Sequence, residues 1–425
     1  MWEKISLIWR IPEIRKKILI VLGLLVVFRV AAHIPIPGVN TSELQSFFNS
    51  NQFLGLLNIF SGGALENFSI VMLGVGPYIT ASIIFQLLVM IIPRLEELQK
   101  EGERGQQKIN QWTRLLTVPL AVLQGYATIT FLKQQQGAQL IGTLSSFDLV
   151  VALVTVTAGT IFLMWIGELI SEQKVGNGIS LLIFAGIVAQ IPLQIQQLAA
   201  TFDATQILNV GVFVLIGLIT IAGVVYVTEA QRNIPVSYAR RIRGNRMFGG
   251  VNTHLPLRVN QAGVIPIIFA VSLVLFPSLI AQFFVNSTNA TVAGIAQWVT
   301  TAFQGGWLYG TLYFILVFAF TYFYTSVVFH PNQVAENLQK QGGFIPGIRP
   351  GRHTEEYLGY VSNRIILAGA LFLGIVAVLP IALQSAAPSQ SLVIGGTSLL
   401  IVVSVVIETV RQIESQLIVR DYEGF

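Results

Sequence analysis

Long runs without a charged residue alternate with polar segments along the whole chain. Five of these runs are long enough, or nearly so, for a helix of about 20 residues across a hydrocarbon core of roughly 30 Å; they cover 67–93, 115–132, 149–167, 175–202 and 204–228. Two longer runs, 259–335 and 365–407, each hold two spans, and Pro380 with the sequence at 386–389 marks the turn in the second. With a further apolar segment at 18–33, the pattern predicts ten membrane spans.

The connections between these predicted spans alternate in charge. Lys and Arg are absent from 35–68, 199–208, 286–307 and 384–391, whereas 93–112, 229–262 and 330–362 each carry several. Because basic residues are retained on the cytoplasmic side of a membrane, the basic connections and both termini are predicted to be cytoplasmic. Ten spans divide into five and five, and an odd number in each half would make the halves inverted repeats with a pathway at their interface.

The composition agrees with a membrane protein and excludes several kinds of chemistry. The chain of 425 residues is 53% hydrophobic and 11% charged, has a net charge of +5, and lacks Cys. It has no G-x-x-x-x-G-K-[ST] loop, no H-E-x-x-H and only four scattered His, so it predicts no enzyme, metal or cofactor. Only Arg29, Glu168 and Glu408 are ionisable within the spans, which weighs against an ion-coupled carrier.

The stretch 60–86 combines apolar character with residues that interrupt helices. It contains Gly62-Gly63 and then Gly74, Gly76 and Pro77 inside an uncharged segment. Non-helical backbone at membrane depth is tolerated where protein covers it or where it lines a watery cavity, because lipid offers no hydrogen-bond partners. The stretch is therefore predicted to face a pore.

Two basic connections, 229–262 and 330–362, are much longer than a turn requires. Both contain Gly and Pro at positions typical of turns, so each is predicted to be an ordered hairpin or looped projection. We interpret both projections as docking surfaces.

Several segments together resemble the SecY family, the channel subunits of the protein translocase. They occur in the order of the family along the whole chain: Pro35 to Gly38, Phe60 to Leu65, Pro77 to Gln86, Met164 to Glu168, Gly176 to Ser180, Thr253 to Leu257, Gly263 to Pro266, Gly347 to Gly351 and Gly395 to Ser398. The resemblance implies an all-α polytopic fold of ten transmembrane helices. Its two inverted five-helix halves, 1–205 and 206–425, would surround a central pore.

The resemblance also implies three groups of residues in the pore. An apolar ring at the waist would seal around a passing chain and dewet when empty; it corresponds to Val75, Ile79, Ile179, Ile183, Ile268 and Ile401. A plug at about 54–67 would fill the outer funnel at rest and includes Phe60, Ser61, Gly62, Gly63, Ala64 and Leu65. A lateral gate toward lipid would be latched by Thr80, Gln124 and Asn260.

Each of these assignments has a plainer alternative. Apolar residues in spans ordinarily pack or face lipid, and the two i,i+4 pairs Val75/Ile79 and Ile179/Ile183 show only that each pair shares a helix face. The plug could be a fixed re-entrant helix, and the gate residues could be ordinary interhelical contacts. The register of the motifs favours the channel interpretation.

On the cytoplasmic side, the resemblance implies docking of a motor and of ribosomes. Partner recognition would use Arg240, Arg241, Arg243, Arg246 and Arg349, through pairing with carboxylates or phosphates. The alternative is that the basic residues hold anionic lipid. The implied partners are SecE-like and SecG-like small membrane subunits, the SecA motor ATPase, the ribosome, signal sequences and unfolded preproteins.

The sequence therefore predicts a passive channel in the cell inner (plasma) membrane. It would translocate unfolded secretory polypeptides and release transmembrane segments laterally into the bilayer, with energy supplied by a partner ATPase or a ribosome. The rival function is a secondary transporter of a small solute, which would need polar or ionisable groups at mid-membrane. A third class, a scramblase or insertase without a through-pore, would need the lateral gate but not the ring.

Overall fold

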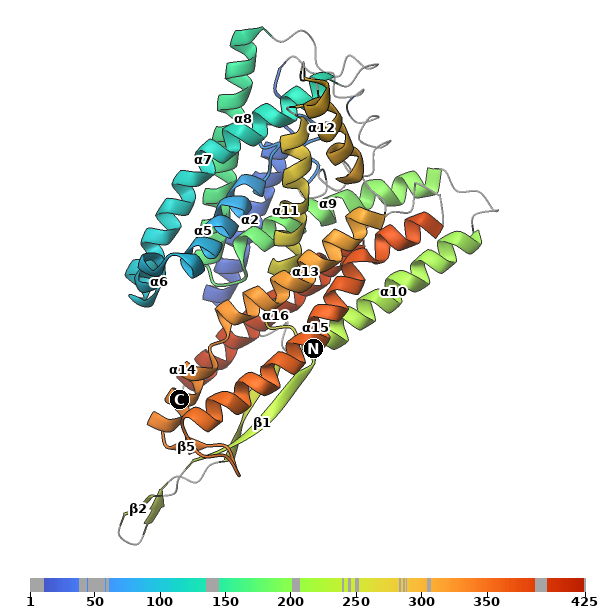
Figure 1. The fold of residues 1–425 in the computed structure, drawn as a ribbon. Coiled ribbons are helices and arrows are strands. Elements are labelled where there is room, and N and C mark those ends of the chain that lie inside the picture. Colours follow the sequence, from blue (N-terminus) through green and yellow to red (C-terminus); the bar gives the residue numbers. More distant parts are fainter. Residues whose placement is uncertain are drawn as a thin grey trace.

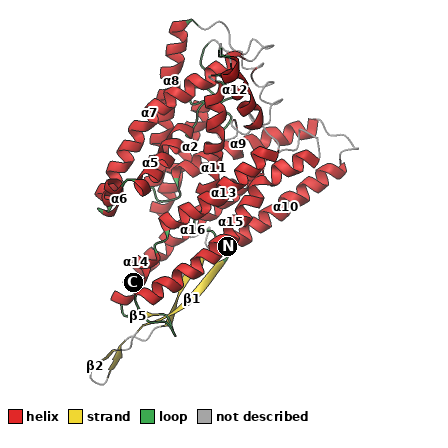
Figure 2. Cartoon of the chain, viewed as in Figure 1, coloured by secondary structure: helices red, strands yellow, loops and turns green. Residues whose placement is uncertain are grey.

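The computed structural model is dominated by helices, with strands gathered at one end of the molecule (Figures 1 and 2). It describes residues 11–37, 44, 58, 61–134, 145–200, 207–238, 241–243, 246–248, 252–282, 284–285, 287, 289–303, 307–386 and 396–423.

The helices of the first part of the chain are α2 (Pro12–Ala32), α5 (Gly76–Ile91), α6 (Pro93–Lys100), α7 (Glu103–Gln134), α8 (Ser146–Glu172), α9 (Gly178–Ala200) and α10 (Ile207–Glu229). The remaining helices are α11 (Ile265–Gln282), α12 (Ala290–Phe303), α13 (Trp307–Val328), α14 (Pro331–Lys340), α15 (Arg352–Ala386) and α16 (Gly396–Glu423). The strands are β1 (Gln231–Tyr238), β2 (Arg241–Arg243), β3 (Arg246–Phe248), β4 (Asn252–Arg258) and β5 (Gly343–Phe344).

Several helices are suited to crossing a membrane. Among the described residues, four helical segments have the necessary length and apolar character: Glu103–Lys133, Ser146–Glu172, Trp307–Lys340 and Arg352–Leu379. The pair α5 and α6 would make a fifth, although the two helices meet at an angle of 101°. Shorter apolar helices occur at Gly178–Leu193, Val214–Glu229 and Ile265–Val274. The predicted number of ten spans stays a prediction.

Local sequence explains where these helices begin and bend. Ser145 caps α8 in a capping box, in which the Phe147 N–H donates to Ser145 Oγ and the Ser145 N–H donates to Asp148 Oδ2. The break between α5 and α6 falls at Ile92, whose extended backbone is the conformation that a following proline favours. Pro93 then occupies the first position of α6.

The structure corrects three sequence predictions of element boundaries. Residues 61–75 form successive turns, so the helix of the interrupted stretch begins only at Gly76. Pro380, predicted at a turn between two spans, lies within α15. The projection predicted to extend to residue 362 ends earlier, because α15 begins at Arg352.

Both predicted projections are ordered, and they share one sheet. Strand β1 pairs antiparallel with β4 along most of its length and with β5 at its end, where Tyr238 lies opposite Gly343. The sheet and α14 cover a small hydrophobic core that contains Ile234, Val236, Leu257, Leu338, Ile345, Leu358 and Val361. It is separate from the large hydrophobic core that the long helices form, to which Ile79, Ile183, Ile268 and Ile401 belong. We refer to β1, β4, β5, α14 and the first turns of α15 as the sheet module.

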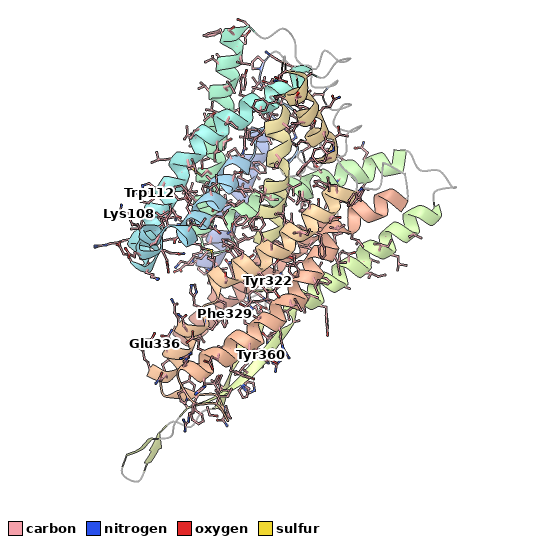
Figure 3. All side chains as sticks on the ribbon, viewed as in Figure 1. Lys108, Trp112, Tyr322, Phe329, Glu336 and Tyr360 are labelled. Carbon is pink, nitrogen blue, oxygen red and sulfur yellow. The ribbon has the colours of Figure 1, made fainter. Side chains whose placement is uncertain are left out.

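Aromatic and basic side chains lie at the levels where helices leave the apolar zone. On α7, Lys108 and Trp112 are one turn apart on the outer surface of the molecule (Figure 3). On α15, the guanidinium of Arg364 lies 4.2 Å from the ring centre of Tyr360. Lys, Arg and Trp side chains with an apolar stem and a polar tip are typical of membrane interfaces.

Candidate functional site

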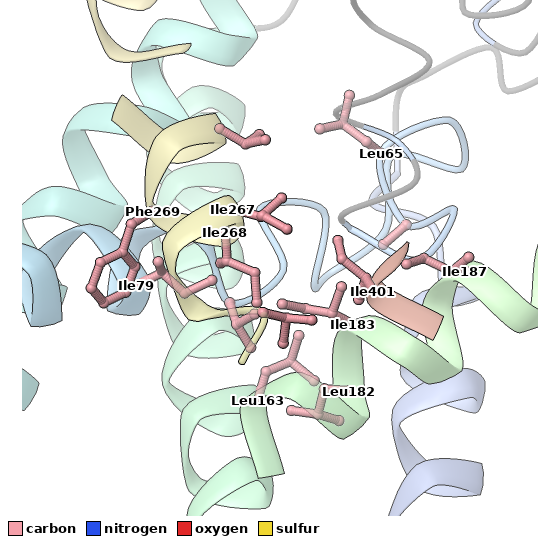
Figure 4. Packing of buried hydrophobic residues seen from close by; sticks show 14 of the residues in the cluster. Leu65, Ile79, Leu163, Leu182, Ile183, Ile187, Ile267, Ile268, Phe269 and Ile401 are labelled. Atoms are coloured by element: carbon pink, nitrogen blue, oxygen red, sulfur yellow. The ribbon is translucent and has the colours of Figure 1, made fainter. Parts of the chain in front are cut away.

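The predicted ring residues come together from four helices. Ile79 of α5, Ile183 of α9, Ile268 of α11 and Ile401 of α16 converge in one cluster (Figure 4), and all four are buried. Val75, just before α5, is buried in the same cluster. These residues are up to 326 positions apart in the sequence, from 75 to 401, so only the tertiary fold brings them together.

Ile179 is the exception among the predicted ring residues. It is only partly buried and packs against the large core. A Cβ added at Gly167 of α8 would lie 2.7 Å from Ile179 Cδ1, so this glycine leaves the space that the isoleucine fills. Ile179 therefore packs against α8 and is less buried than its neighbour Ile183.

Other apolar residues of the cluster were not predicted as ring residues, although Leu65 was predicted in the plug. Leu65, Leu163, Leu182, Ile187, Ile267 and Phe269 lie around the convergence point (Figure 4). Ile187 extends the spacing of four from Ile179 and Ile183 and could have been found from that pattern. Leu163 comes from α8, and no local pattern distinguishes it from other apolar residues of that helix.

The arrangement can form an apolar seal. The six predicted ring residues are Val and Ile, so their own side chains offer no charge or hydrogen-bonding group to a passing ion or peptide. Narrow hydrophobic constrictions block ions by excluding water, and they do so without binding a polar ligand. The chemistry of the cluster therefore favours a gate over a solute-binding site.

The described part of the predicted plug is packed beside this cluster. Ser61, Ala64 and Leu65 are buried. Ser61 Oγ donates to the Asn58 carbonyl at 2.9 Å and accepts from the Leu65 N–H at 3.2 Å. Phe60 and residues 54–57 and 59, also predicted in the plug, lie outside the described residues.

Gly62 and Gly63 form a sharp turn in the predicted plug. Both have positive φ, +72° and +81°, a conformation that residues with a Cβ rarely adopt. A Cβ at Gly62 would also lie 2.8 Å from Phe28 Cζ and 2.9 Å from the Gly186 Cα, so α2 and α9 both approach the plug closely. The glycine pair is thus held in a closely packed turn.

Arg29, the charge that the sequence places inside the first span, contacts this turn. Its Nη1 donates to the Gly62 carbonyl. Glu66, further along the plug, attracts Arg29 electrostatically and accepts a hydrogen bond from Asn58 Nδ2 at 2.7 Å. Arg29 therefore faces protein, and the sequence did not indicate that its partner is Gly62 of the predicted plug.

Thr80 and Gln124 lie on packed helices and Asn260 lies in the loop before α11, so the three predicted gate residues do not form one hydrogen-bonded group. Gln124 Nε2 of α7 donates to Thr80 Oγ1 of α5 at 3.5 Å, a long and weak contact. Asn260 instead bonds within its own loop: its Oδ1 accepts from the Gly263 N–H at 2.9 Å, and its Nδ2 donates to the Gly263 carbonyl at 3.3 Å. The predicted lateral gate corresponds to the contact between α11 and the pair α5 and α7, which pack against it.

The predicted docking arginines lie at the end of the molecule that carries the sheet module (Figure 1). Arg241 is on β2 and Arg246 on β3, and the register pairs Arg243 with Arg246. Arg349 is exposed in the turn between β5 and α15, where its carbonyl accepts a hydrogen bond from Thr354 Oγ1 at 3.0 Å. Arg240 lies outside the described residues.

Comparison with known proteins identifies the family. The SecY family model matches residues 69–410. The protein translocase subunit SecY of Streptomyces scabiei is 46% identical over 432 residues, covering 98% of each chain. The protein of the same name from Mycobacterium tuberculosis is 46% identical over 437 residues, again covering 98% of each chain. The chain belongs to the SecY family.

Solved structures share the fold at low sequence identity. A protein-conducting channel matches with a TM-score of 0.63 at 18% identity and covers 93% of this chain and 91% of its own. A SecY structure described by its plug domain matches with a TM-score of 0.64 at 20% identity, with coverages of 92% and 90%. Sec61 in a canine ribosome–channel complex matches with a TM-score of 0.60 at 17% identity, with coverages of 93% and 91%. The predicted all-α polytopic membrane fold is confirmed.

This SecY family chain has a cluster of charged side chains that the sequence did not predict. Arg411 of α16 pairs with Glu229 at the end of α10 at 2.6 Å and donates to the Thr228 carbonyl at 3.4 Å. Arg258, at the end of β4, lies near both residues. The pKa of Arg258 is lowered, first by burial and then by the charge of Arg411, and the charges of Glu229 and Glu408 offset part of this change. The base of the β1–β4 hairpin is thereby tied to the helix that carries Ile401.

Proposed function

We propose that this chain is the protein-conducting channel of a translocase. It would translocate unfolded secretory polypeptides through the aliphatic cluster and release transmembrane segments sideways into the bilayer. The observation that carries the proposal is the convergence of Ile79, Ile183, Ile268 and Ile401 from four helices (Figure 4). Aliphatic side chains of this size can close around an extended chain of any sequence without binding it.

The proposed channel runs between two halves, 1–205 and 206–425. The first half supplies Val75, Ile79, Ile179 and Ile183 to the ring, and the second supplies Ile268 and Ile401. The proposed lateral gate is the seam where α11 of the second half packs against α5 and α7 of the first. The polar contact between Thr80 and Gln124 is weak and joins two helices of the same half, so separation of the halves leaves it intact.

The proposed plug keeps the channel closed at rest. Its turn at Gly62 fits between α2 and α9, and Arg29 holds the Gly62 carbonyl. A hydrogen bond that involves a charged group contributes about 1.5–3 kcal/mol. Contacts of this strength hold the plug in place and are still reversible when a polypeptide enters.

The channel is passive in this proposal, and partners supply the energy. Arg349 and the arginines of β2 and β3 provide a basic surface for a SecA-like motor or a ribosome. SecE-like and SecG-like subunits would complete the complex. The chain would lie in the cell inner membrane with both termini cytoplasmic, because the basic connections belong on that side.

A single introduced cysteine tests the polypeptide path, since the chain has no Cys. Ile183→Cys would be reconstituted with the partner subunits, motor and ATP, together with a secretory precursor arrested during translocation. We expect a crosslink from position 183 to the precursor that requires both the signal sequence and ATP. Leu218→Cys is the matched control, because Leu218 is 59% exposed on the apolar surface of α10.

Two results would overturn parts of the proposal. No crosslink at position 183, under conditions where the precursor is transported, would show that the ring is wrongly assigned. No transport by the unmodified chain, where a control translocase works, would favour the solute transporter instead. An equal crosslink at positions 183 and 218 would show that the reaction does not report the path.

A further inference from the structure

Helix α12 has an unusual surface for an element that joins two membrane helices. It has 14 residues, about 21 Å of helix, which is too short to cross the hydrocarbon core. It packs against α11 and α13, and it lies at the end of the molecule opposite β2 (Figure 1). Asn289 begins the helix by accepting a hydrogen bond from the Thr291 N–H at 3.1 Å, as an N-cap residue does.

The helix divides into three faces. Ala296 and Thr300, four residues apart, are buried and form the face that packs on the neighbouring helices. Val292, Ile295 and Trp298 recur every three residues and form a second, exposed face; their exposed fractions are 37%, 61% and 66%. Gln297 and Thr301, again four residues apart, form a third face that is exposed and polar.

This division is typical of a helix that lies in a membrane interface. An interfacial helix places an apolar edge among the headgroups and first acyl carbons and turns a polar edge to water. Trp is enriched at this depth because its ring is apolar and its N–H can donate to water or headgroups. Trp307, at the start of α13, is 81% exposed and would lie in the same belt.

The two helices against which α12 packs also expose apolar side chains. Leu273 and Ile280 of α11 are 40% and 41% exposed, and Ile315 of α13 is 53% exposed. No residue of α12 is charged, so electrostatic attraction to anionic headgroups does not contribute. An uncharged helix with an exposed apolar face is suited to a lipid interface, whether the headgroups are charged or neutral. It is less suited to a charged protein partner.

We propose that α12 is an interfacial membrane anchor for α11. Val292, Ile295 and Trp298 insert among lipid headgroups and upper acyl chains, while Gln297 and Thr301 face water. Since α11 carries Ile268 and packs against α5 and α7, the anchor holds one end of this helix at a fixed depth. The inference requires only that the chain spans a membrane and is independent of what passes through the channel.

Spin labels on the cysteine-free chain test the anchor. Ile295→Cys and Gln297→Cys would be labelled separately and reconstituted in phosphatidylcholine vesicles and in phosphatidylglycerol vesicles. Collisions with oxygen, which concentrates in lipid, and with a water-soluble nickel chelate would then be measured. We expect oxygen to dominate at position 295 and nickel at position 297, in both kinds of vesicle.

Each other outcome contradicts the proposal. Nickel collisions as frequent at position 295 as at 297 would place the whole helix in water. Few collisions with either reagent at position 295 would mean that protein covers this face. Lipid contact in phosphatidylglycerol vesicles alone would contradict an uncharged anchor. Val292→Cys, on the same face as Ile295, gives a second site if labelling at position 295 disturbs the fold.

Discussion

At the scale of single residues, Gly62 and Arg29 link the proposed plug to α2 and α9. The Gly62 backbone has a conformation that favours glycine, and its carbonyl is the acceptor for Arg29 Nη1. The close approach of the Gly186 Cα leaves no room for a side chain at this position. A change at Gly62 therefore alters backbone strain, packing against α9 and the arginine contact together.

Gly102 is a matched control that separates strain from packing. Its φ of +79° is close to the +72° of Gly62, but a Cβ at Gly102 would meet nothing within 4 Å. Gly102→Ala should therefore cost only the conformational strain, roughly 1–2 kcal/mol. Gly62→Ala should cost more, and it should raise ion leakage through the idle channel in proteoliposomes, whereas Gly102→Ala should not. Equal leakage from the two variants would contradict a role for the close contact.

At the scale of elements, strand β1 joins β4, which ends at Arg258, to β5, which begins at Gly343. It pairs with β4 of its own hairpin and with β5 of the second projection, and Ile234 of β1 lies in the small core with Leu338 and Leu358. The sheet module is therefore one folding unit with its own core, and a partner that binds either projection contacts a surface fixed by both.

Ile234→Ala tests this unit. Ile234 is 1% exposed, and truncation of a buried isoleucine to alanine costs about 2–5 kcal/mol. Since each 1.4 kcal/mol is about tenfold in an equilibrium, amide exchange in β1, β4 and β5 should become more than roughly tenfold faster. Exchange in α8 should not change, and Leu218→Ala, on the exposed surface of α10, should leave both regions unaffected. Unchanged exchange in β5 would mean that the projections are independent.

At the scale of the whole molecule, the sheet module of the basic connections and helix α12 of a connection without Lys or Arg lie at opposite ends. The sheet module, with Arg349 and the arginines of β2 and β3, is at one end, and α12 is at the other (Figure 1). The uneven charge predicts that the sheet module is on the cytoplasmic side, because basic segments are retained in the cytoplasm.

Thiol labelling tests this orientation. Thr253→Cys, exposed on β4, and Gln297→Cys, exposed on α12, would be treated separately in spheroplasts with a maleimide that cannot cross the membrane. Gln297→Cys should react in intact spheroplasts, and Thr253→Cys should react only after lysis. The reverse pattern would show that the sheet module is outside and that the predicted topology is wrong.

The sequence alone determined the class of the protein and much of its local structure. Charge-free runs identify membrane segments because a helix in lipid must be about 20 apolar residues long. The spacing of Ile179 and Ile183, the Gly62-Gly63 pair and the order of the family motifs depend only on positions along the chain. The basic projections were predicted as ordered because their Gly and Pro residues favour defined turns.

Only the tertiary structure decided which residues meet. Arg29 finds Gly62, Asn260 bonds to Gly263 and not to Gln124, and Leu163 joins the aliphatic cluster. The contact of Arg29 and the place of Leu163 have no local signal, because side chains within a membrane segment look alike in sequence whether they face lipid, a neighbouring helix or a pore. Asn260 and Gly263 are only three residues apart, and there the tertiary structure decided only that Asn260 does not bond to Gln124. The pairing of β1 with β5 likewise depends on how two distant segments are brought together, which a reading of each segment by itself does not contain.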